Sequence, residues 1–209
     1  MTFVRSRTVR NLTIVLTTLL TAFAYPLIGS AQTPTSTTYV SEQFGYQITW
    51  PDTWSLETTG SEAGAFDMVM LKNGDATATI VITRPGDTPL SDIVGFMIDG
   101  PDSGAPAFVP GMTANDGDGN PIEGETAERA WLAQNGNLAG EDVDGFTQFR
   151  YGEVRRLEGD LGVGLSLAMP ATSFDGDIAP YSALLDGVTK MGTIASPVAS
   201  RAGSQKNDG

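Results

Sequence analysis

The chain has 209 residues, of which 12 are Lys or Arg and 25 are Asp or Glu, for a formal net charge of −13. It contains neither Cys nor His, which excludes disulfide bonds, Cys/His zinc sites, cysteine nucleophiles and histidine acid–base catalysis. The negative charge repels phosphate groups, so we expect no nucleic-acid partner and no affinity for anionic lipid.

The first 31 residues predict a removable secretory signal. Three arginines and no acidic residue lie in the first ten positions, an apolar run follows over 12–28, and small residues occupy 29–31. A retained membrane anchor is the alternative, but threonines dilute the run and Pro26 interrupts it, whereas a spanning helix needs about 20 apolar residues. We therefore expect a secreted or periplasmic chain that starts near Gln32, carries a net charge of −16 and keeps no stable membrane span.

Composition divides the remainder into three parts. Residues 32–38 are rich in Thr, Ser and Pro and predict a linker. Residues 192–209 are rich in Gly, Ser and Ala without periodicity, and they predict a disordered tail. Residues 39–191 have the length and the apolar content of one globular domain.

Two strand patterns open this domain. Residues 44–50 alternate aromatic or β-branched side chains with Gly, Gln and Thr, and this period of two predicts a strand that ends at Pro51. Residues 66–71 and 76–83 flank Asn73-Gly74, a dipeptide that supplies the positive φ angles of a tight turn. We therefore expect a hairpin over these two runs.

A helix and a long loop are predicted next. Thr88 and Pro89 suit a helix start, and apolar residues recur at helical spacing as far as Ile98, where Gly100 and the following proline end the helix. Residues 101–124 hold several Gly, Pro and Asp and predict a loop, which at this length is either functional or mobile.

Further strands follow the loop. Residues 126–134 contain helix formers but also alternate, and the hairpin that follows favours a strand. That hairpin joins 146–157 to 161–169 through Glu-Gly-Asp. Its last strand has large apolar residues on one face and small residues on the other, so we expect a helix to pack closely on the small face. The small residues are Gly162, Gly164, Ser166 and Ala168.

A final helix is predicted after Asp177, a capping residue. Its apolar face is formed at helical spacing by Tyr181, Leu184, Leu185, Val188 and Met191. Hairpins with inserted helices predict an α+β fold with a central, mostly antiparallel sheet.

Residues 44–54, FGYQITWPDTW, resemble the F-G-Y-x-I-x-Y-P-x-x-W opening of the PsbP-like (PsbP/Mog-like) family, with Trp50 in place of the usual Tyr. The order of elements over 39–191 is also similar. The resemblance implies helices on both faces of the sheet, an α/β/α sandwich. It implies no reaction and no catalytic residues, and the better-known members of the family bind other proteins.

The run 115–120, Asn-Asp-Gly-Asp-Gly-Asn, is the one metal-like motif. Oxygen atoms of Asp116, Asp118 and Asn120 are ligands of the type that calcium takes. EF-hand spacing fails, because Pro121 stands where the required Gly belongs and Ala127 where the bidentate Glu belongs. The alternative is a plain acidic turn, since Asp, Asn and Gly are common turn residues.

No other motif selects a chemistry. Ser166 lies in the middle of a predicted strand and has no His to activate it, so we expect no serine nucleophile. The carboxylates allow a hydrolase with an acid pair, but no pair is singled out. Trp50, Trp54 and Trp131 are expected in the core rather than in a ligand groove. We therefore expect an exported non-enzymatic domain that binds a protein or an envelope component; the alternatives are a carboxylate-based hydrolase and a carrier of calcium or a small ligand, and no other cofactor is expected.

The signal prediction has a direct test. Because residues 29–31 form a small-residue cleavage site, protein recovered from the cell exterior should begin near Gln32 when its N-terminus is sequenced. Exported protein that still begins at Met1 would show that the segment is retained.

Overall fold

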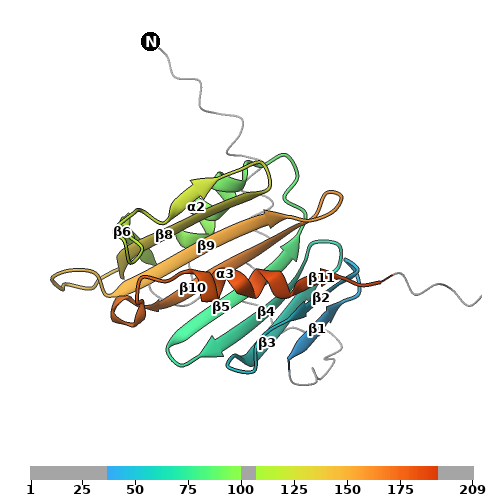
Figure 1. The fold of residues 1–209 in the computed structure, drawn as a ribbon, viewed down its shortest axis with the longest axis horizontal. Coiled ribbons are helices and arrows are strands. Elements are labelled where there is room, and N and C mark those ends of the chain that lie inside the picture. Colours follow the sequence, from blue (N-terminus) through green and yellow to red (C-terminus); the bar gives the residue numbers. More distant parts are fainter. Residues whose placement is uncertain (1–36, 100–106, 193–209) are drawn as a thin grey trace, which may run out of the picture.

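The computed structural model describes residues 37–99 and 107–192, and these residues are mostly β-structure (Figure 1). The large sheet is antiparallel throughout, with eight strands in the order β3-β4-β5-β10-β9-β8-β6, and β7 pairs with β8. A second, three-stranded sheet has the order β1-β2-β11. The elements are β1 Thr38–Ser41, β2 Tyr46–Thr49, β3 Ser55–Glu62, β4 Phe66–Asn73, β5 Ala76–Thr83, α2 Leu90–Asp99, β6 Phe108–Thr113, β7 Glu123–Glu125, β8 Arg129–Leu138, β9 Gln148–Arg156, β10 Gly162–Pro170, η2 Ala171–Ser173, α3 Ala179–Ser182, η3 Ala183–Gly187 and β11 Val188–Lys190.

One face of the large sheet is covered by α2, which lies against β9, β8 and β6 (Figure 1). Val94 and Ile98 of the helix are buried against Val154 of β9. Small residues in the strands allow this close approach: a Cβ atom on Gly164 would lie 3.0 Å from Cε of Met97, and one on Gly152 would lie 3.3 Å from the carbonyl oxygen of Val94. The predicted helix on the small face is thus present.

The other face of the large sheet carries the main core. Leu165 and Leu167 of β10 and Tyr151 of β9 are fully buried there. They belong to one cluster with Ile48 of the three-stranded sheet and Leu184 of η3. Alternation along β10 therefore sends large side chains to this face and small ones to the helix, and Gly152 of β9 also faces the helix.

The predicted sandwich with helices on both faces is wrong. Opposite α2, the cover is the three-stranded sheet together with α3, a helix of four residues continued by the 3-10 turn η3. The long final helix is also wrong, because Val188 begins β11 and pairs with Ile48 of β2. The fold is therefore predominantly β rather than α+β with two helical layers.

Both predicted hairpins are confirmed. β4 pairs with β5, although the two residues between the strands are Gly74 and Asp75, one position later than the expected Asn73-Gly74; φ of Gly74 is 56°. β9 pairs with β10 through a turn that contains Gly159. The 44–50 strand is confirmed in the shorter form β2, and it lies in the small sheet.

The predicted loop over 101–124 is wrong in part. Residues 108–113 form β6 and residues 123–125 form β7, and both pair with β8 along one edge of the large sheet. The signal, most of the linker, the 193–209 part of the tail and residues 100–106 lie outside the described residues. Within the described part of the chain, no helix is long and apolar enough to cross a membrane.

Two substitutions test this two-sided burial by thermal and denaturant melts. Leu165→Ala removes a fully buried side chain and should cost about 2–5 kcal/mol of unfolding free energy. Gly164→Leu forces a side chain against Met97 and should cost about 1–3 kcal/mol. Thr58→Leu, at an exposed position of β3, is the control and should change stability by about 0.5 kcal/mol or less. A Gly164→Leu variant as stable as the parent would contradict the packing of α2 on this face.

Candidate functional site

A buried carboxylate, Glu153 of β9, joins this strand to β8 through Arg129. Glu153 is fully buried, and Tyr151 donates a hydrogen bond of 2.5 Å from its hydroxyl to Oε2. Nε of Arg155 donates to Oε1 at 2.7 Å, and Nε of Arg129 lies 2.6 Å from the same oxygen as an ion pair. Burial, and then the hydrogen bond to Glu153, raise the pKa of the Tyr151 hydroxyl. Both oxygens of the carboxylate are therefore engaged.

Arg155 also holds the α3–η3 segment. Its Nη2 donates to the carbonyl oxygen of Ser182 at 2.9 Å and to Oγ at 3.0 Å, and its Nη1 pairs with Oδ1 of Asp186 at 2.5 Å. Hydrogen bonds to charged partners are among the stronger interactions in proteins. We assign this cluster a structural role, the attachment of the α3–η3 segment to β9, because neither carboxylate oxygen of Glu153 is open to a substrate.

A second buried carboxylate joins the two sheets. Ser41 of β1 donates to Oδ2 of Asp67 at 2.5 Å, and Gln43 donates to Oδ1 at 2.8 Å. Burial raises the pKa of Tyr39 to about 12, with the nearby charge of Asp67 adding to the rise. Asp67 and Glu153 thus belong to separate clusters, and each is occupied by donors from its own neighbours. These two buried acids therefore do not form the acid pair that a hydrolase needs.

The metal-like run forms a compact turn. Oδ1 of Asp116 accepts backbone N–H groups of Asp118 at 3.0 Å and Asn120 at 2.8 Å, and these bonds, that of Asn120 first, lower the pKa of Asp116. Asp118 and Asn120 are exposed, and N–H of Gly117 donates to the carbonyl oxygen of Gly176 at 3.0 Å. In the described ranges no three Asp or Glu side chains gather as metal ligands. Calcium binding here stays a prediction.

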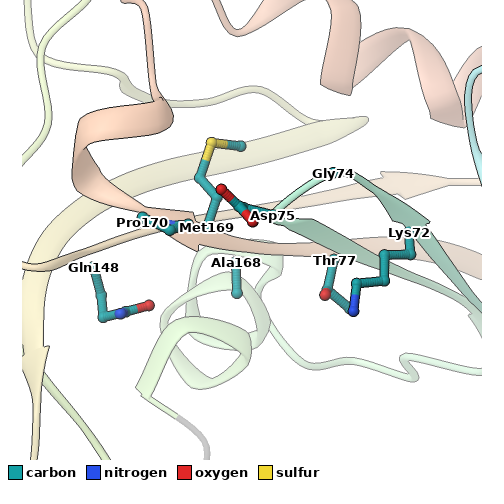
Figure 2. A pocket seen from close by; sticks show the side chains of 8 residues that line it. All are labelled: Lys72, Gly74, Asp75, Thr77, Gln148, Ala168, Met169 and Pro170. Atoms are coloured by element: carbon teal, nitrogen blue, oxygen red, sulfur yellow. The ribbon is translucent and has the colours of Figure 1, made fainter.

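A groove of about 390 Å³ lies where the β4–β5 hairpin meets the ends of β9 and β10 (Figure 2). Lys72 and Thr77 point toward one another across part of it, and Gln148 lines the other side. The groove is open, and its lining holds one acid, Asp75, and one base, Lys72.

The large hydrophobic side chains that the structure leaves exposed, within the described residues, gather at one end of the large sheet. β6 is the terminal strand, and Val109 and Met112 are 53% and 60% exposed. Val109 pairs with Asn137 and Met112 with Asn135, because a bulge between Pro110 and Met112 adds one residue. This bulge places Val109 and Met112 on the same face, although they are three residues apart.

The loop between β8 and β9 completes this surface. A Cβ atom on Gly111 would lie 2.0 Å from the ring of Phe146, so the ring rests directly on β6 at a position that only glycine allows. Phe146 is 39% exposed, and Val143 in the same loop is also exposed. We call Val109, Met112, Val143 and Phe146 the β6 surface. Contiguous exposed apolar side chains of this kind mark interaction sites on many proteins.

Sequence reasoning missed both the Glu153 cluster and the β6 surface. A glutamate in a strand is ordinarily assumed to face water, and Pro110-Gly111 indicated a loop. The apolar residues on either side of that pair, Val109 and Met112, were the available signal. The prediction that Trp50 and Trp54 lie in the core is confirmed, and Trp131 is half-buried beneath Arg129, 4.4 Å from ring to guanidinium.

Removing the buried carboxylate of Glu153 tests the structural role of this cluster. Glu153→Ala leaves Arg129 and Arg155 without their shared partner and should cost about 3 kcal/mol, the low end for a broken buried pair because both arginines keep some contact with water. Asp186→Asn removes only an exposed partner and should cost about 1 kcal/mol or less. Equal effects of the two variants in denaturant melts would contradict the assignment.

Comparison with known proteins gives limited information. No known protein family matches the chain, and no curated protein matches it. The solution structure of cyanobacterial PsbP (CyanoP) from Synechocystis sp. is similar, with a TM-score of 0.47 and 12% identity over 79% of this chain and 99% of that one. At this level of similarity no residue role or partner is transferred to this chain.

Proposed function

We propose that the chain is an exported, non-enzymatic domain that binds another protein through the β6 surface. The observation that carries the proposal is the concentration of exposed large hydrophobic side chains on one terminal strand and its adjoining loop. Water contact with such side chains costs free energy that a partner removes by covering them. Export rests on the basic and apolar N-terminal segment.

The opposite end of the large sheet supports this choice of surface. β3 is the other terminal strand, and its sequence, SLETTGSE, is polar apart from Leu56. Exposed edge strands are commonly protected from chance pairing by polar and charged residues. β3 has this protection, whereas β6 has Val109 and Met112 exposed. The difference favours β6 as the edge that meets a partner.

The two alternative functions have less support. A carboxylate hydrolase needs two acids placed about a substrate, but the buried acids Glu153 and Asp67 are both held by internal donors. A calcium carrier needs six to eight oxygen ligands, but the Asp116 carboxylate accepts bonds from its own turn. The binding domain is therefore the function that the described residues favour.

The experiment uses the mature chain as immobilised bait for envelope and culture-fluid proteins. The parent is compared with Val109→Thr/Met112→Gln, which keeps the size of both side chains but makes them polar. Thr58→Gln on the β3 edge is the matched control. We expect a protein that binds the parent and the control but not the β6 variant, with the parent and both variants equally stable in melts. Identical sets of proteins on all three baits would overturn the proposal.

A further inference from the structure

We infer that the β6 surface accepts an extended segment of a partner protein in which basic and apolar side chains alternate, laid along β6 as an additional strand. The inference rests on the proposed function and specifies the chemistry of the partner. It follows from three features of the described residues: the backbone of β6, the side chains on its exposed face, and the charge around it.

The backbone of β6 has a strand partner on one side only in the described part of the sheet. An extended segment can pair with such an edge through main-chain hydrogen bonds, a common mode of peptide recognition. Pro110 has no N–H group, and the bulge beside it interrupts a regular ladder. Main-chain pairing is therefore short, and side-chain contacts must supply much of the affinity.

The side chains favour an alternating segment. Val109 and Met112 face the same side of the sheet, and the ring of Phe146 lies against β6 at Gly111. An added strand turns every second side chain toward this side. Apolar residues at those positions would cover Val109 and Met112, while the intervening side chains point to the opposite face of the sheet.

The charge around the surface is strongly negative. Glu141, Asp142 and Asp144 are exposed in the loop that carries Val143 and Phe146. Over 107–148 the chain has a single basic residue, Arg129, which is paired with Glu153, and the next one, Arg150, is buried with its guanidinium over the ring of Phe108. The acids of the same stretch are Asp116, Asp118, Glu123, Glu125, Glu128, Glu141, Asp142 and Asp144. Basic side chains on a partner complement this negative charge. The attraction speeds association of a basic partner, and the same charge repels acidic partners.

The same features disfavour two other occupants. A second copy of this chain would bring the same acidic loop, and like charges at an interface are repelled. A bilayer with anionic lipids would be repelled by Asp142, Asp144 and their neighbours. A basic, apolar protein segment satisfies both the charge and the apolar side chains.

The test titrates the mature chain with three synthetic peptides of about eight residues, the length of an ordinary strand. One alternates Lys and Val, one alternates Glu and Val, and one alternates Lys and Ser. We expect the Lys–Val peptide to bind at least about tenfold more tightly than either other peptide, and salt to weaken it. Asp142→Asn/Asp144→Asn should weaken its binding about fivefold or more, whereas Glu57→Gln/Glu62→Gln, an exposed acid pair on β3, should leave it unchanged.

The outcomes separate this inference from the proposed function. If Lys–Val and Glu–Val peptides bind equally and Val109→Thr/Met112→Gln weakens both, the basic partner is wrong and the binding surface stands. If neither Val109→Thr/Met112→Gln nor Asp142→Asn/Asp144→Asn changes the binding of any peptide, both the inference and the proposed function are wrong. Sedimentation that shows a dimer abolished by Val109→Thr/Met112→Gln would assign the surface to a second copy and overturn the inference, as would binding to anionic vesicles that this variant abolishes.

Discussion

Burial of the middle of the large sheet on both faces is the constraint on which the rest of the fold depends. β9 and β10 send small residues such as Gly152 and Gly164 toward α2, and large residues such as Tyr151 and Leu165 toward the opposite core. One helix and one three-stranded sheet supply the cover (Figure 1). They cover the central strands on both faces. At the end of the sheet, Phe108 of β6 is buried on the α2 face, whereas Val109 and Met112 are exposed on the other face.

The distribution of charge also differs between the buried centre of the sheet and the exposed surface around β6. Buried Glu153 is neutralised by Arg129 and Arg155, and surface pairs join Arg84 to Asp160 and Lys190 to Glu158. The sequence from 130 to 149, which includes the acidic loop between β8 and β9, contains no basic residue, and Arg150 just after it is buried over the ring of Phe108. The β6 surface thus combines exposed apolar side chains with the exposed acids of the adjoining loop, two properties that one partner segment can satisfy together.

Local sequence patterns predicted the hairpins and the small face under α2, because period-two alternation and turn residues act over a few positions. They failed where distant pairing decides the structure. Leu184, Leu185 and Val188 have helical spacing, but Val188 pairs with Ile48, some 140 residues away, and the helix ends after a turn. Likewise, Pro110-Gly111 indicated a loop, since no local signal shows that β8 provides a partner and that Phe146 needs a glycine beneath it.

The central claim is that β6 is the edge of the sheet that binds a partner, and backbone amide hydrogen exchange measures this directly. Exchange is followed in the mature chain with and without the alternating Lys–Val peptide at saturation. The account predicts slower exchange in β6 and in residues 139–147 and unchanged exchange in β3 and in the β4–β5 turn beside the groove. Slower exchange at β3 or around Gly74, with none at β6, would contradict it.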